Sequence, residues 1–189
     1  MASIIDGLRS EHVRMARLLD ILAREIATFE NGDLPDYDLV ADILAYALSY
    51  PDLVHHPTEE LVLERLLARV PEVASEIGDL TTEHERLAAL TRRFSAAMQN
   101  VLQDHTLPRD WFVDVAKDYL GFSRRHMQME EVVFFPAALR HLQEEDWAAI
   151  EDGANRRADA LNGGDAEETE RFRRLLEAVE AITEDNAAA

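Results

Sequence analysis

The sequence predicts an all-α protein, built as an up-down-up-down four-helix bundle with two additional C-terminal helices. The first observation is periodic: apolar residues recur every three or four positions through long intervals, as amphipathic helices require. The second is the scarcity of helix breakers, because the 189 residues include only 7 Gly and 6 Pro, and these cluster in short segments. At the N-terminal end the helical pattern runs through Leu8, Met15, Leu18, Leu19, Leu22 and Ile26.

Clusters of helix breakers divide the chain into elements. The strongest clusters lie at 31–35, 69–71, 104–108 and 162–164, with a weaker break between 136 and 144. We therefore expect four long helices and two shorter ones, at residues 3–30, 37–68, 72–104, 109–140, 144–161 and 165–184. Short loops between long helices imply antiparallel neighbours. The expected domains are the bundle, 1–142, and a C-terminal helical extension, 143–189, that packs on the bundle or at an oligomer interface.

Two prolines fall within the second expected helix. Pro57 removes a backbone donor and bends the helix. Because Pro51 lies shortly before it, the alternative is that this helix consists of two pieces joined near Pro51. Either arrangement puts the bend next to His56.

The composition excludes several classes of function. The chain has no cysteine, so any metal must be held by nitrogen and oxygen. Its 38 acidic residues outnumber 19 basic ones, a formal charge of −19 that would repel nucleic acid and anionic membranes alike. The N-terminal segment mixes charged residues into its apolar positions, unlike a secretory signal. We therefore expect a cytoplasmic protein that binds neither nucleic acid nor membrane.

Four histidines, His12, His56, His84 and His126, fall one on each expected long helix. In an antiparallel hairpin, two residues lie at the same depth when they are equally far from the turn that joins them. The midpoints of successive histidine pairs are positions 34, 70 and 105, and each midpoint lies in a breaker cluster. The four histidines are therefore predicted to share one layer of the bundle.

Two of these histidines begin a His-x-x-x-Glu pair, His56 with Glu60 and His126 with Glu130. Residues four apart share a helix face, so each helix can direct an imidazole and a carboxylate inward together. Buried carboxylates are costly unless they are paired or bind metal. Four imidazoles and two carboxylates suit a pair of ions, with iron or manganese favoured. His55 is expected to point away from this metal, and it is the substitute ligand if the register is displaced.

The order His, His-x-x-x-Glu, His, His-x-x-x-Glu resembles the hemerythrin-like family, which carries the HHE cation-binding domain. The resemblance covers about residues 4–140, and the segments 50–60 and 126–136 are similar to those of bacterial members. It implies two iron ions beneath an oxo or hydroxo group, with manganese or zinc as alternatives. The implied ligands are His12 and His56 on one iron, His84 and His126 on the other, and Glu60 and Glu130 bridging both.

The third expected helix departs from the oxygen-carrying hemerythrins, in which a second histidine follows the first after four residues. Here that position, four after His84, is Ala88, so one nitrogen ligand is missing and an iron is expected to keep a position open. We expect dioxygen, nitric oxide or peroxide to bind or react there, and whether the protein is an enzyme stays open. The alternative is an iron-handling or sensing protein whose folding and partner contacts depend on metal. A structural bundle holding zinc or no metal is the third interpretation.

Overall fold

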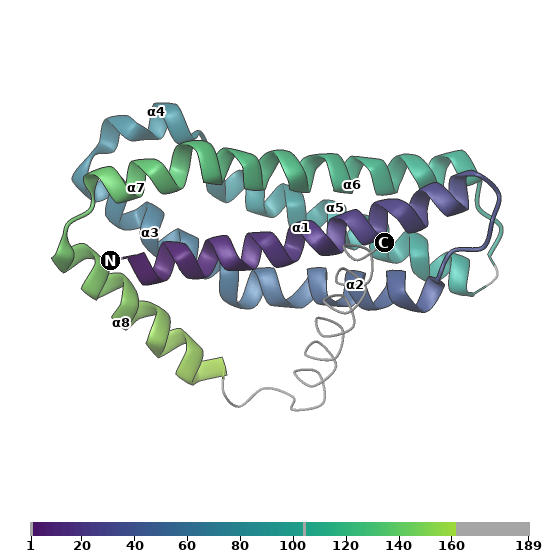
Figure 1. Cartoon of the computed structure of the whole chain (residues 1–189), viewed down its shortest axis with the longest axis horizontal. Coiled ribbons are helices and arrows are strands. Elements are labelled where there is room, and N and C mark those ends of the chain that lie inside the picture. Colours follow the sequence, from purple (N-terminus) through teal and green to yellow (C-terminus); the bar gives the residue numbers. More distant parts are fainter. Residues whose placement is uncertain (1, 104, 162–189) are drawn as a thin grey trace, which may run out of the picture.

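The computed structural model describes residues 2–103 and 105–161, and all regular structure in these residues is helical (Figure 1). The all-α fold class is therefore confirmed. In chain order the elements are α1 (Ala2–Glu30), α2 (Tyr37–Tyr50), η1 (Pro51–His55), α3 (His56–Arg69), η2 (Pro71–Val73), α4 (Ala74–Ile77), α5 (Leu80–Leu102), α6 (Arg109–Met129), η3 (Glu130–Phe134), α7 (Phe135–His141) and α8 (Glu144–Leu161).

Four helical columns form the up-down-up-down bundle (Figure 1). The first is α1, the second runs through α2, η1 and α3, the third is α5, and the fourth runs through α6, η3 and α7. Helix α1 contacts α2 and α6, and α5 contacts the same two helices, so columns adjacent in sequence are adjacent in space. Each column buries its apolar stripe against the other three.

Two of the columns contain a π-helical turn, η1 in the second and η3 in the fourth. In each turn a backbone N–H donates to the carbonyl five residues earlier, from His56 to Pro51 and from Phe135 to Glu130. The second column is therefore one helix with a π-turn after Tyr50, and the fourth continues to His141 without a break at Pro136. A π-turn inserts one extra residue and so rotates the faces of the helix before and after it relative to each other.

The prediction of one continuous helix at 72–104 is wrong, because the helix is interrupted at Gly78. This residue ends α4 with φ of 78°, a conformation open to glycine and strained for other residues. The backbone N–H of Thr82 donates to the Asp79 carboxylate, which caps the new helix α5. A lone Gly-Asp pair thus ends one helix and begins another.

The core has two parts, and the layer of histidines lies between them along every column. One part is centred on Leu22, Ile43, Phe94 and Phe112, and the other on Ile5, Val62, Leu66, Phe134 and Phe135. Helix α8 contacts α3 and adds Trp147 and Ile150 to the second part. The expected helix 165–184 lies outside the described residues. No helix in the described part of the chain is long and apolar enough to cross a membrane.

Candidate metal centre

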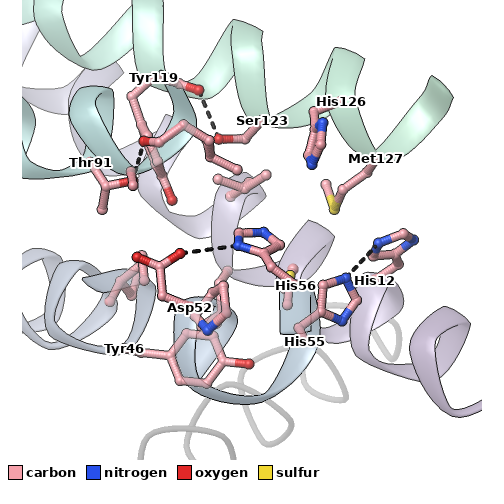
Figure 2. Close-up of a pocket in the computed structure, with 18 of the residues that line it drawn as sticks. His12, Tyr46, Asp52, His55, His56, Thr91, Tyr119, Ser123, His126 and Met127 are labelled. Atoms are coloured by element: carbon pink, nitrogen blue, oxygen red, sulfur yellow. Dashed lines mark hydrogen bonds and ion pairs between the residues drawn. The ribbon is translucent and has the colours of Figure 1, made fainter. Parts of the chain in front are cut away.

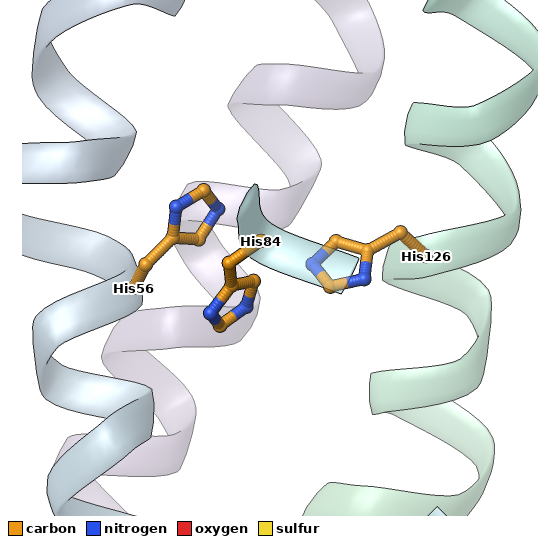
Figure 3. Close-up of side chains that lie close together, drawn as sticks. All are labelled: His56, His84 and His126. Carbon is orange, nitrogen blue, oxygen red and sulfur yellow. The ribbon is translucent and has the colours of Figure 1, made fainter. Parts of the chain in front are cut away.

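Seven side chains that can bind a metal meet in one buried layer, contributed by all four columns. Each is at most 6% exposed. Figure 3 shows three of the histidines converging from three different helices. The seven are His12 of α1, His55 of η1, His56 and Glu59 of α3, His84 of α5, His126 of α6 and Glu130 of η3.

The first group of donor atoms comes from His12, His55, Glu59 and Glu130. The Nε2 atoms of His12 and His55 lie 3.0 Å apart (Figure 2). The His55 Nε2 atom is 3.2 Å from Glu59 Oε1, and the His12 Nε2 atom is 3.3 Å from Glu130 Oε2. One donor atom from each residue lies within 4.8 Å of the others, so a single cation can bind all four.

The second group comes from His56, His84 and His126, whose donor atoms also lie within 4.8 Å of one another. The rings of His56 and His84 stack with centroids 4.0 Å apart. The same two carboxylates reach this group with their other oxygens: His84 Nε2 is 3.4 Å from Glu59 Oε2, and His126 Nε2 is 3.0 Å from Glu130 Oε1. Glu59 and Glu130 therefore each present one oxygen to each group, as carboxylates that bridge two ions do.

Outer carboxylates hold the far side of four of the five rings. Each carboxylate contacts the Nδ1 atom of one histidine. The Nε2 atom of that ring is then directed at the donor groups in the middle of the bundle. Within the described residues, the buried Nδ1 atom of His84 has no hydrogen-bond partner. The four pairs are Glu131 with His12 at 2.9 Å, Glu11 with His55 at 2.7 Å, Asp52 with His56 at 3.0 Å and Glu83 with His126 at 2.9 Å.

Burial and neighbouring charges shift the pKa values of the residues in this layer in opposite directions. Burial alone would lower the pKa of His55, but Glu59 and Glu11 raise it to about 10. The pKa of His84 is raised to about 9 by Glu130 and Glu59, again against the effect of burial. Burial would raise the pKa of Glu130, whereas contacts with the imidazoles of His12, His126 and His84 hold it well below its usual value. Without metal, protonated imidazoles thus neutralise the ionised carboxylates.

The donor set fits a metal ion on two counts. Among residues 2–103 and 105–161, no group makes a hydrogen bond of good geometry to the buried atoms Glu59 Oε1, Glu59 Oε2, Glu130 Oε2 and His126 Nε2. Leaving such atoms unpaired is costly unless a cation binds them. Imidazole nitrogen with carboxylate oxygen is also the mixture that first-row transition metals accept.

The structure brings five of the six sequence-predicted residues together in the layer and leaves the sixth outside it. His12, His56, His84, His126 and Glu130 are brought together, whereas the Glu60 side chain is exposed. Its place is taken by Glu59, which is 0% exposed.

The register of the second column explains this difference. Glu59 shares its helix face with Val62 and Leu66, both fully buried, because residues three and seven positions apart face the same side. The inward pair is therefore His55-x-x-x-Glu59, one residue before the predicted pair His56-x-x-x-Glu60. His55 and His56 both turn inward, and they can do so because they enter different donor groups.

A small cavity of about 50 Å³ adjoins the layer. Apolar side chains form most of its wall, including Met15, Leu18, Ile43 and Leu87. Ala88 lines it as well, so the position where oxygen-carrying hemerythrins are expected to add a ligand is here part of the cavity wall.

The sequence profile of the Hemerythrin HHE cation binding domain matches residues 3–138 and, in a second match, residues 77–188. The chain belongs to this family. Nothing among curated proteins and nothing among solved structures matches the chain. This hemerythrin-family bundle thus carries its buried His and Glu layer within the segment that the first match covers, and the layer fits a cation site.

Proposed function

We propose that this protein is a non-haem diiron protein. His12 and His55 would hold one iron, His56, His84 and His126 would hold the other, and Glu59 and Glu130 would each offer one oxygen to both. The proposal rests on one observation above all: each of the two buried carboxylates offers one oxygen to each donor group. Membership of a cation-binding family supports the same conclusion.

Iron suits this donor set better than the alternatives. Zinc favours four-coordinate sites, whereas five imidazoles and two bridging carboxylates provide more donors than two such sites need. Manganese accepts the same ligands, so metal analysis has to decide between the two.

The small molecule that we propose as partner is dioxygen, nitric oxide or peroxide. The iron pair would supply one- and two-electron redox chemistry to a molecule bound at an open position. The chain's own contribution is positional: outer carboxylates fix the rings of His12 and His55, and the apolar cavity excludes bulk water and larger molecules. The first group contains two imidazoles and the second contains three, so the open position belongs to the first.

Metal analysis combined with absorbance spectroscopy tests this proposal. We expect two irons per chain and a near-ultraviolet band that bleaches on anaerobic reduction. The spectrum should change again when dioxygen, nitric oxide or peroxide is added. A protein that contains one redox-silent metal, or none, after expression with ample iron would contradict the proposal.

A second function, iron handling or sensing, is favoured by the way the ligands are distributed. They come from all four columns, and in the part of the chain that the structure describes several of their polar atoms have no hydrogen-bond partner. Metal occupancy should therefore raise bundle stability and can alter the contacts that the protein makes. If the metal-free and iron-loaded proteins melt at the same temperature, this function is excluded.

A further inference from the structure

The two halves of the bundle repeat one pattern of site residues. In each half a Glu-His pair on the first column is followed by a His-x-x-x-Glu pair on the next, and the Glu of the first pair binds the His of the second. Glu11 lies 2.7 Å from His55, 44 residues later, and Glu83 lies 2.9 Å from His126, 43 residues later. The site therefore has approximate two-fold symmetry, which relates the first donor group to the second.

This symmetry fails at the residue that follows the second histidine of each half. In the first half this residue is His56, which joins His84 and His126 in the second donor group. In the second half it is Met127, which lies beside His12 in the walls of the same cavities. The second donor group thus has a third imidazole, whereas the equivalent sequence position for the first group is a thioether. Thioether sulfur is a poor ligand for iron in such a nitrogen and oxygen site.

Met127 also lies between the surface and the cavity of about 50 Å³ beside the histidine layer, here called the central cavity. A groove of about 420 Å³, here called the α1–α6 groove, runs outside the bundle between α1 and the fourth column. It is lined by Arg9, Val13, Ala16, Gln128 and Glu131. His12 and Met127 line both this groove and the central cavity. Figure 2 shows the sulfur of Met127 directed between the rings of His126 and His12.

The Met127 side chain is suited to changing its conformation between the α1–α6 groove and the central cavity. Met127 is only partly buried, and methionine has three rotatable bonds and no branch, so it can change conformation at little cost. His12, in contrast, is fixed by Glu131 on its Nδ1 side. Of the two residues shared by groove and cavity, Met127 is therefore the one that can open.

We propose that Met127 admits the small molecule from the α1–α6 groove to the open position of the ion held by His12 and His55, and that it keeps this position open. The proposal rests on the diiron function proposed above. The ligand class is a molecule of two or three heavy atoms, since the cavity beyond Met127 measures only about 50 Å³. Met127 is thus a specificity-determining residue that touches the bound molecule.

Azide is the probe for the experiment, added to the oxidised iron-loaded full chain and followed by stopped-flow absorbance. Three variants are compared with the wild type. Met127→His supplies the missing imidazole, and we expect it to lose azide binding while it retains two metals. Met127→Ala should bind azide faster than the wild type, and Met127→Phe slower.

A second measurement does not depend on the iron chemistry. Zinc-loaded Met127→His should release metal to a chelator more slowly than zinc-loaded wild type, because one ion gains a ligand. The inference is overturned if all three variants bind azide at the wild-type rate and affinity, or if the wild type holds two irons but binds no azide. A wild type that holds no metal pair would instead overturn the proposed function, and this inference with it.

Discussion

The Nε2 atoms of His12 and His55 lie 3.0 Å apart, while the Nδ1 atoms of the same rings contact Glu131 and Glu11. If both Nδ1 atoms donate a proton to their carboxylates and both rings are neutral, two lone pairs face each other across this distance. A proton on one ring or a cation between the rings removes the repulsion. The metal-free layer is therefore a site in which protons occupy the place of metal.

Proton occupancy makes the stability of the metal-free protein depend on pH. The pKa of His55 is raised from 6.5 to about 10 and that of His84 to about 9. A group whose pKa is higher in the folded state than in the unfolded state stabilises the fold. This stabilisation is complete when the pH is below the unfolded-state pKa, and it is lost as the pH rises through the folded-state pKa. We expect the Tm of the metal-free protein to fall between pH 7 and pH 10 and the affinity for metal to rise. A metal-free Tm that increases over this range would contradict the assignment.

The outer carboxylate Glu11 should contribute to metal binding although it does not belong to either donor group. It pairs with His55 Nδ1 at 2.7 Å and accepts a hydrogen bond from the Tyr50 hydroxyl at 2.7 Å. Glu11→Gln should weaken metal binding by about tenfold to a hundredfold, the usual effect of losing such a partner. Competition with a coloured chelator measures this change. Tyr50→Phe, which leaves the carboxylate in place, is the control and should have a smaller effect.

Two glycine substitutions should change stability in opposite directions. Gly78 has φ of 78° and ψ of −158°, a region that other residues avoid, so Gly78→Ala should destabilise the fold by about 1–3 kcal/mol. Gly7 lies within α1, and a Cβ there meets nothing within 4 Å. Gly7→Ala should therefore stabilise the fold by about 0.5–1 kcal/mol. Chemical denaturation of the metal-loaded protein measures both, and equal signs would show that one backbone argument is wrong.

The bundle itself could be predicted from the sequence because its signals are local. Apolar spacing and breaker clusters place α1, α8 and the fourth column, from α6 to α7, close to their observed positions. The break at Gly78 was missed since a single glycine does not usually end a helix, and only its positive φ, which depends on the surrounding packing, makes it do so.

Five of the seven residues in the buried layer could be predicted from the sequence, and the difference at Glu59 and Glu60 has a physical origin. The segment from His55 to Glu60 contains two overlapping His-x-x-x-Glu pairs, and equal depth in the bundle does not distinguish adjacent residues. The buried face of α3, marked by Val62 and Leu66, does distinguish them and was available in the sequence. The inward direction of both His55 and His56 was not available in the sequence, because it depends on the π-turn η1 and on the entry of His56 into the same donor group as His84 and His126.

Glu59 and Glu60 provide the most direct test of the central claim, since the two neighbours differ in burial and are identical in chemistry. The measurement is metal content per chain of the purified Glu59→Gln and Glu60→Gln variants beside the wild type, each expressed with ample iron. The proposed centre predicts two irons in the wild type and in Glu60→Gln, and one or none in Glu59→Gln. Two irons in Glu59→Gln, with loss of metal in Glu60→Gln, would contradict it.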